Sequence, residues 1–293
     1  MEQLIKQNLI DTIRLYLPEE FTLENHPVRK NTGAERDAVF LVGKEKTGVS
    51  PVVYLEDYLE ELQSGRETKD MAREIVRQLL SFMPSSHQQR NLYESLWHFE
   101  KAKDRIIFRL LSGTRHRDFL RDCPGRPYLD LLVSYAVLME REDMDGYGLA
   151  QVKNPLAEHW GVSEEELFRL ACRNTEKRLG KLLKPLSDYA PLITVPEESP
   201  GLYCLTNDAG FYGAGLILYP EILRNFSEEQ GSDILIVPSS VHEVILIPRK
   251  DACPEAELNR IIREVNGMLN DEEILSDHAY LYRRRTGATE SLL

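Results

Sequence analysis

Residues 233–248 read DILIVPSSVHEVILIP, two short apolar runs that flank a polar corner. Both runs are rich in branched aliphatic residues, which favour strands, and they are too short for most helices. The corner between them contains proline and two serines, which are residues typical of turns. We therefore predict a strand over 233–238, a turn, and a second strand over 241–248.

The order of elements around this stretch predicts the architecture of the last third of the chain. A strand over 202–206 and a helix over 210–225 precede the stretch, and a helix over 255–269 and a strand over 278–282 follow it. This order is typical of a mixed sheet with helices packed on it. Gly210, Gly213 and Gly215 lower the stability of the predicted helix, so we expect another segment to pack very close to it.

The rest of the chain predicts a first unit of similar kind. We expect a helix that Pro18 ends, strands over 39–42 and 49–54 around a turn at 43–48, and helices over 55–62 and 68–82. The stretches 92–99 and 106–111 fit either a strand pair or a strand and a helix. An apolar run over 129–138 predicts a buried strand, Asn154 is the expected N-cap of a short helix, and Ser163 begins a capping box with Glu166.

These patterns predict an α/β protein of the mixed α+β kind, with two units that each hold a small mixed sheet with helices packed on it. The predicted domains are an N-terminal helical and α/β region over 1–126 and a C-terminal mixed-sheet α/β domain over 127–293. The proline-rich stretch 185–200 is the expected linker or long loop.

Charge and apolar run length exclude several classes of protein. The formal net charge is -12, so the average surface repels phosphate backbones and anionic lipids, and a nucleic-acid partner is not expected. The longest apolar runs fall far short of the ~20 residues of a membrane span, and the first residues do not resemble a signal peptide. The four cysteines lie at scattered positions without metal-like spacing, which is typical of reduced thiols. We expect a cytoplasmic protein that does not associate with membranes.

The stretch VPSSVHEVILIP at 237–248 also resembles an uncharacterised family of clostridial and gut-bacterial proteins, catalogued as domain of unknown function 5688. Weaker matches are PVVYLE at 51–56, DL at 130–131, WGVS at 160–163 and GAGLILY at 213–219. The resemblance extends over nearly the whole chain. It implies a cytoplasmic bacterial protein, in some cases carried on mobile elements, and it implies no activity.

The corner holds the weak candidates for a catalytic site, namely Ser239, Ser240, His242 and Glu243. A serine nucleophile with His242 as base would make a hydrolase, and His242 as ligand or base would suit a metal-dependent nuclease. In a strand, however, His242 and Glu243 point to opposite faces. We favour the interpretation that the corner is a structural turn, with its hydroxyl groups bonded to the backbone.

No cofactor or metal is predicted. The sequence GKEKTG at 43–48 has the wrong order for a phosphate-binding loop, and His-Glu-Val-Ile-Leu lacks the second histidine of a zinc helix. Oxygen and nitrogen ligands for a metal are scattered along the chain: Asp57, Asp130, Asp208, Glu243, Asp277, His159, His242 and His278. Scattered acidic residues in an acidic protein are usually solvated.

A basic stretch runs against the overall charge. Residues 101–126 hold eight lysines and arginines against three aspartates. Its candidate contacts for an anion or a nucleic acid are Arg105, Arg109, Arg115, Arg117 and Arg121. We expect most of these charges to pair with carboxylates of the same chain.

The sequence leaves the biochemical function open, and we expect a non-enzymatic protein that acts by contact with a protein partner. The alternatives are a hydrolase or metal-dependent nuclease at the 239–243 corner, and nucleic-acid binding through residues 101–126. Seven aromatic residues would suit a protein interface or ordinary packing: Tyr54, Tyr58, Tyr203, Phe211, Tyr212, Tyr219 and Phe226.

Overall fold

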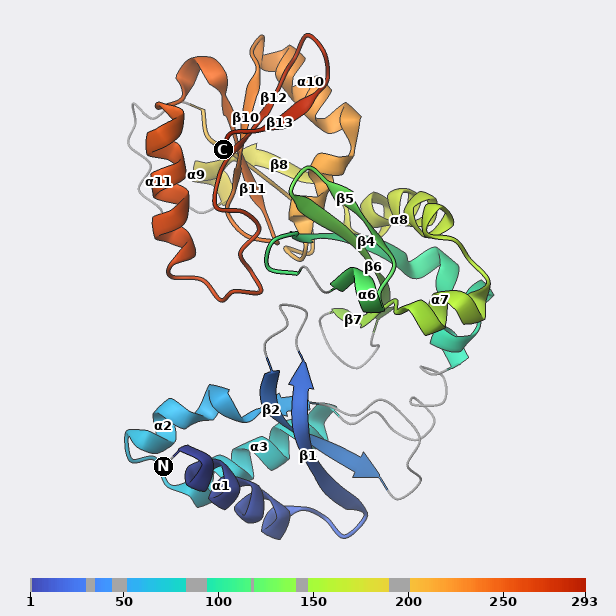
Figure 1. The fold of residues 1–293 in the computed structure, drawn as a ribbon, viewed down its shortest axis with the longest axis vertical. Coiled ribbons are helices and arrows are strands. Elements are labelled where there is room, and N and C mark those ends of the chain that lie inside the picture. The colour runs from blue at the N-terminus through green and yellow to red at the C-terminus, as the bar shows by residue number, and fades with distance from the viewer. Residues whose placement is uncertain are drawn as a thin grey trace. The chain divides into compact units, whose positions relative to one another are not determined.

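A computed structural model describes residues 2–29, 35–43, 52–82, 94–116, 119–140, 147–189 and 201–293. The chain forms two compact units, Met1–Lys101 and Ala102–Leu293 (Figure 1). The predicted boundary after residue 126 falls inside strand β5, Gly125–Tyr128, of the second unit. The reason is that the apolar run over 129–138 pairs in one sheet with residues 106–112 and 125–128, which precede it in sequence.

The first unit places two helices on one face of a three-stranded antiparallel sheet of order β1-β2-β3. Alternate residues of β2, Val39 and Leu41, are buried against Ile13 of α1 and Ile75 of α3. The elements are α1 Glu2–Tyr16, β1 Phe21–Arg29, β2 Glu35–Gly43, β3 Val52–Tyr54, η1 Leu55–Tyr58, α2 Leu59–Gln63 and α3 Thr68–Phe82.

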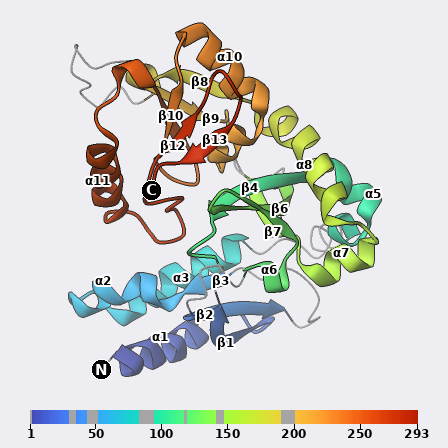
Figure 2. The same cartoon turned by 45° about the horizontal axis from the view of Figure 1, so that its top comes forward.

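The second unit begins with a four-stranded antiparallel sheet in which β6 pairs with β4, β5 and β7. Helix α8 packs against β4, and Figure 2 shows it beside this sheet. The short helix α5 Phe99–Ala102 spans the boundary between the units. The elements that follow it are η2 Lys103–Arg105, β4 Ile106–Ser112, α6 Phe119–Asp122, β5, β6 Leu131–Glu140, β7 Tyr147–Gln151, α7 Asn154–Trp160 and α8 Glu164–Leu179.

A six-stranded antiparallel sheet, of order β13-β12-β10-β11-β9-β8, completes the second unit. Leu235, Ile247 and Leu281 on one face of this sheet are buried against Leu258 and Ile262 of α11. Figures 1 and 2 show α10 on the other side of the strands. The elements are β8 Leu182–Pro185, α9 Leu186–Tyr189, β9 Tyr203–Thr206, η3 Gly213–Leu218, α10 Pro220–Gln230, β10 Ile234–Pro238, β11 Val244–Pro248, η4 Arg249–Asp251, α11 Glu255–Asn266, β12 Tyr280–Tyr282 and β13 Thr289–Ser291.

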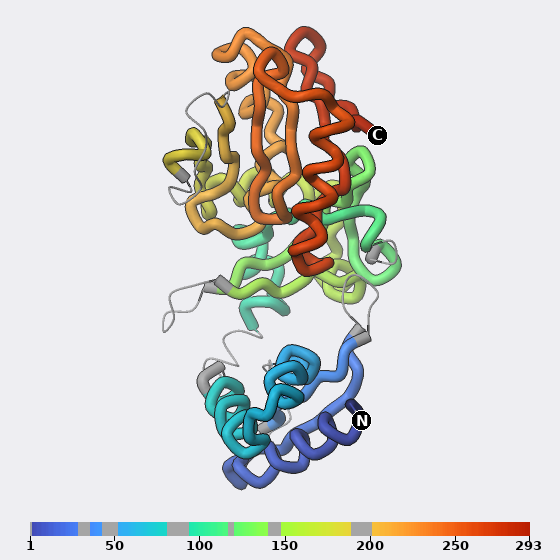
Figure 3. The backbone as a smooth tube through the Cα atoms, turned by 90° about the vertical axis from the view of Figure 1, so that its left-hand side faces the viewer, coloured from blue at the N-terminus to red at the C-terminus, as the bar shows by residue number. Residues whose placement is uncertain are grey.

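The structure confirms the mixed α and β class, and every strand pair among the described residues is antiparallel. The hairpin predicted over 233–248 is present as β10 and β11, which run side by side in Figure 3. Ser163 caps α8 by accepting a hydrogen bond from the Glu166 amide at 3.2 Å, as predicted. Asn154 is not an N-cap: it lies inside α7, and its side chain donates to the carbonyl of Arg121 at 2.9 Å.

The helix predicted over 210–225 is two elements, η3 and α10, because Pro220 begins a new helix. The close packing expected at its glycines is confirmed. A Cβ on Gly215 would lie 2.8 Å from the Phe108 ring, and one on Gly213 would lie 2.4 Å from Thr206 Oγ1. These glycines let η3 lie directly against β4 and β9.

Candidate functional site

The predicted corner between β10 and β11 is closed by its own hydrogen bonds. Ser240 Oγ donates to Glu243 Oε1 at 3.0 Å and accepts from the His242 amide at 2.9 Å. The amides of Ser239 and Ser240 both donate to the Glu243 carbonyl, at 3.3 and 3.2 Å. Ser240 and Glu243 are thus hydrogen-bonded to each other within the turn, as is typical of a structural corner.

The His242 ring is held by the backbone of a neighbouring loop. Its Nδ1 accepts a hydrogen bond from the Tyr212 amide at 3.2 Å, so the neutral ring carries its hydrogen on Nε2. Among the described residues no hydrogen bond joins the side chains of Ser240 and His242. The nucleophile and base of the hydrolase hypothesis are therefore not paired in this conformation, and that hypothesis stays a prediction.

The loop at 207–213 presents Tyr212 next to this corner. Asn207 fixes the loop by a reciprocal pair of hydrogen bonds with the backbone of Phe211, at 2.7 and 3.1 Å. Tyr212 has the left-handed conformation, with φ 53° and ψ 31°, which is uncommon for a residue other than glycine. A Cβ on Gly213 would lie 2.7 Å from the His242 carbonyl oxygen, so the loop and the corner are in close contact.

Most of the predicted arginine candidates have partners within the chain. Arg115 pairs with Asp271 at 3.2 Å and Asp277 at 3.3 Å. Arg105 contacts the sulfur of Met139, and the backbone of Arg121 accepts from Asn154. Arg117 lies outside the described residues. The expected pairing of the basic stretch with carboxylates of the same chain thus holds for Arg115.

Arg109 differs from the other arginines of this stretch. It lies on β4 and is 6% exposed. One terminal nitrogen donates to the Gln151 side-chain oxygen, and Nε is buried without a hydrogen-bond partner. Within the part of the chain that the structure describes, no carboxylate forms an ion pair with it. Arg109 is a deeply buried cation whose described partners are one amide oxygen and one aromatic ring.

A second unpaired donor lies on the neighbouring strand, directly opposite Arg109. Ser134 of β6 is the cross-strand partner of Arg109, and its Oγ is buried without a hydrogen-bond partner. Directly opposed residues of antiparallel strands project to the same face. Gln151 pairs with Ala136, two residues beyond Ser134, and so lies on that face too. Arg109, Ser134 and Gln151 form one polar cluster on the sheet.

The two regions that the sequence singled out meet at Tyr212. The Arg109 guanidinium lies 5.1 Å from the centre of the Tyr212 ring, and the His242 ring lies 5.4 Å from it. The Phe211 ring packs against Tyr212 at 4.7 Å. We call Arg109, Ser134, Gln151, Tyr212 and His242 the Arg109 site. Sequence reasoning missed Ser134 and Gln151, and it placed Tyr212 only in a general aromatic set.

Two titratable groups near Arg109 do not supply a negative charge. Burial raises the pKa of the Cys123 thiol, which the positive charges of Lys153 and Arg109 only partly offset. For His116 burial acts in the opposite direction and lowers the pKa, since it disfavours the charged imidazolium. The positive charge of Arg109 lowers this pKa further. At neutral pH we therefore expect a neutral thiol and a neutral imidazole beside the guanidinium.

The predicted metal ligands do not gather. Asp277 pairs with Arg115, Glu243 accepts from Ser240, and Asp57 pairs with Arg36. Asp130 accepts from the Tyr280 hydroxyl at 2.9 Å and lies 3.5 Å from His278 Nε2. Among the described residues no group of three histidines, cysteines or carboxylates is placed to hold a metal ion.

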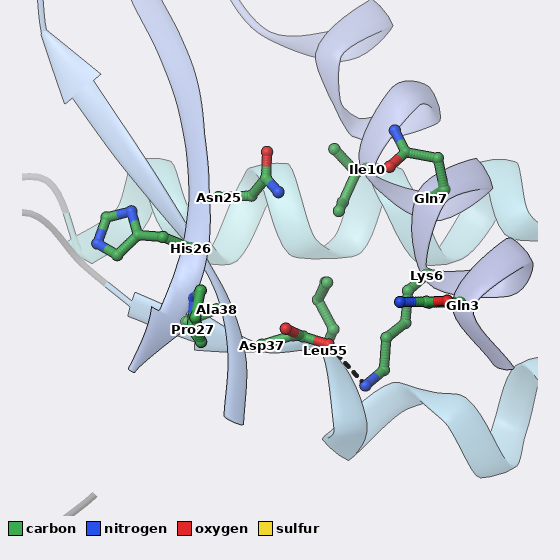
Figure 4. Close-up of a pocket in the computed structure, with 10 residues that line it drawn as sticks. All are labelled: Gln3, Lys6, Gln7, Ile10, Asn25, His26, Pro27, Asp37, Ala38 and Leu55. Carbon is green, nitrogen blue, oxygen red and sulfur yellow. Dashed lines mark hydrogen bonds and ion pairs between the residues drawn. The ribbon is translucent and has the colours of Figure 1, made fainter. Parts of the chain in front are cut away.

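A cavity of about 250 Å³ lies in the first unit, between α1 and strands β1 and β2 (Figure 4). Its charged wall is Lys6, which pairs with Asp37 at 2.9 Å and Glu56 at 2.7 Å. Burial opposes the charge of Lys6, but the hydrogen bonds that it donates to these carboxylates raise its pKa well above the ordinary value. Since this lysine already has its partners, the cavity is a weaker candidate than the Arg109 site.

Comparison with known proteins places the chain in a family. A model described as a family of unknown function, DUF5688, matches residues 3–284. The chain belongs to the DUF5688 family. No curated protein and no solved structure matches it. In the described parts of this DUF5688 protein, no helix has the length and apolar character needed to cross a membrane. The family assignment agrees with the resemblance found in the corner sequence.

Proposed function

We propose that this DUF5688 protein works by non-covalent binding, and that it holds an anionic group of its partner at the Arg109 site. The observation that carries the proposal is the burial of Arg109 without a carboxylate partner among the described residues. Removing an ion from water costs several kcal/mol unless an opposite charge compensates it. A guanidinium in this position gains that compensation when an anion binds.

The charge of the protein narrows the kind of partner. A net charge of -12 repels polyanions such as nucleic acids, so we propose a ligand with a single anionic group. Such a group occurs on small metabolites and on the side chains or C-terminus of a protein. The proposal therefore keeps the predicted protein partner, in a bacterial cytoplasm, and names the chemistry by which the partner is recognised.

The alternative functions have less support. A hydrolase at the corner needs His242 paired with a nucleophile, whereas its Nδ1 is bonded to the Tyr212 amide. A metal-dependent nuclease needs further ligands beside His242, and the described residues place no group of three such ligands together. Nucleic-acid binding through residues 101–126 needs a row of free cations, whereas Arg115 and Arg126 are paired with carboxylates.

The test replaces Arg109 by glutamine, which removes the charge and keeps a polar side chain. Acetate, benzoate and inorganic phosphate are titrated at constant ionic strength, and the His242 ring signals are followed by NMR. We expect saturable shifts in the wild-type protein and none in Arg109→Gln. Arg260→Gln is the matched control, because Arg260 is exposed and its ion-pair partner among the described residues is Glu264, one turn away on α11. Equal shifts in the wild-type protein and Arg109→Gln would contradict the proposal.

A further inference from the structure

We infer that the anion is a carboxylate, and that it takes the place of the Tyr212 ring against Arg109. This inference rests on the proposed function. It is drawn from three features of the Arg109 site: two buried hydrogen-bond donors without described acceptors, a single arginine, and an aromatic ring that lies over the guanidinium.

The two donors are Arg109 Nε and Ser134 Oγ. Both atoms are buried and have neither a protein acceptor among the described residues nor contact with solvent. Buried donors without acceptors are rare in folded proteins, because each loses its bonds to water. The two residues are directly opposed on β4 and β6 and project to the same face. One group with two acceptor oxygens satisfies both donors.

The charge of the site selects among such groups. Arg109 supplies one positive charge, and the nearby Arg115 is already paired with Asp271 and Asp277. A carboxylate brings one negative charge on two oxygens, which matches this arrangement. A phosphate dianion brings a second negative charge, and Arg109 is the one lysine or arginine among the five residues of the Arg109 site. Burying a charge that is not compensated is unfavourable. Gln151 holds the other side of the guanidinium in place.

Tyr212 covers the guanidinium that carries one of these two donors. Its ring stacks on the guanidinium at 5.1 Å, a contact that partly compensates the buried charge when no anion is bound. In this proposal a ligand oxygen reaches the two buried donors only after the Tyr212 ring moves. The loop offers the freedom for such a movement, since Gly210 has φ +61° and Phe211 and Tyr212 are only partly buried. The ring and the ligand therefore compete for one position.

The test compares three variants by titration with benzoate, with benzamide as the uncharged control. Tyr212→Gly removes the ring, and glycine suits the left-handed backbone at this position, so we expect about tenfold tighter binding because no cation–π contact is broken. Ser134→Ala removes one donor, and we expect about tenfold weaker binding with no loss of stability. Arg260→Gln on α11 lies outside the Arg109 site and should bind benzoate as the wild-type protein does. Far-UV circular dichroism checks that each variant is folded.

The outcomes separate this inference from the proposed function. If Arg109→Gln abolishes benzoate binding but Tyr212→Gly binds equally or more weakly, the site is real and the displacement of Tyr212 is contradicted. Unchanged affinity in Ser134→Ala, or tighter binding of phosphate than of benzoate, also overturns the inference. If benzoate does not bind, or binds equally to the wild-type protein and Arg109→Gln, both the proposed function and this inference are contradicted.

Discussion

Arg126 and Arg109 lie on neighbouring parts of the same antiparallel sheet, and both guanidinium groups stack on an aromatic ring. Arg126 of β5 lies 3.9 Å from the Phe168 ring and donates two hydrogen bonds to Glu164, at 2.8 and 2.7 Å. It also contacts Glu165 at 2.7 Å. Arg109 of β4 has the ring of Tyr212 and no described carboxylate.

The more deeply buried of the two arginines is the one without a described carboxylate partner, which is the opposite of what the free-energy cost of burying a charge favours. The side chain of Arg126 is 27% exposed and has two carboxylates, whereas Arg109 is 6% exposed. A cation needs a counter-ion most where solvent is least available. Arg126 therefore has a structural role, and a ligand is the expected counter-ion of Arg109.

The largest expected difference in stability is between Arg126→Met and a surface control. Removing Arg126 leaves Glu164 partly buried without its bidentate partner, so we expect the free energy of unfolding to fall by about 2–3 kcal/mol. Arg260→Met, on the exposed face of α11, should change it by less than about 0.5 kcal/mol. Urea denaturation measures both. Equal values for the two variants would remove the structural role assigned to Arg126.

A smaller effect is expected at the tyrosines of the two regions. The Tyr135 hydroxyl is buried and donates to Glu164, so Tyr135→Phe should lower the free energy of unfolding by about 1–2 kcal/mol. The Tyr212 side chain contributes its ring, so Tyr212→Phe should leave the free energy unchanged. Thermal and urea unfolding test the pair, and the reverse order would contradict the assigned roles.

The two regions should also differ in their dependence on pH. Burial opposes ionisation of Glu164, but hydrogen bonds from Arg126 and Tyr135 overcome it and lower its pKa below the ordinary value of 4.5. The stabilisation is therefore present above the unfolded-state pKa and is lost as pH falls through the lower folded-state pKa. We expect Glu164→Gln to lose less stability than the wild-type protein between pH 6 and the acid range. Identical pH profiles in urea would contradict this.

The smallest expected effect concerns the cysteines beside each arginine. Burial raises the pKa of Cys123, near Arg109, and of Cys172, near Arg126, and each arginine partly offsets this. Arg109→Met should raise the pKa of Cys123 further and slow its alkylation at alkaline pH, and Arg126→Met should do the same for Cys172. Mass spectrometry of iodoacetamide-labelled peptides resolves the two sites. A change in the alkylation rate of Cys172 in Arg109→Met, or of Cys123 in Arg126→Met, would show that each arginine also affects the pKa of the other cysteine.

The parts of the fold that local chemistry determines were predictable. Ser163 caps α8 through a hydrogen bond to a residue three positions away, and the aliphatic runs around the corner form β10 and β11. Strand β1, with the sequence FTLENHPVR, was missed because it carries few of the residues that favour strands. The four residues of β5 were missed because their pairing with β6 is set by tertiary contacts.

The Arg109 site was predictable only in part. The sequence marked Arg109 within a basic stretch and His242 within a corner, but it did not show that one loop joins them. Nor did it show which arginine lacks a counter-ion, because the partners of Arg115 lie 156 and 162 residues away. Ser134 gives no signal within an apolar strand until its register against Arg109 is known.

The most direct test of the account is the free energy of unfolding of Arg109→Met, measured in urea with and without benzoate at constant ionic strength. Methionine of similar length removes an uncompensated buried charge, so we predict a variant as stable as the wild-type protein or more stable, which benzoate no longer stabilises. A loss of about 2–3 kcal/mol, as expected for Arg126→Met, would show that Arg109 is a structural residue with its partners already in the fold.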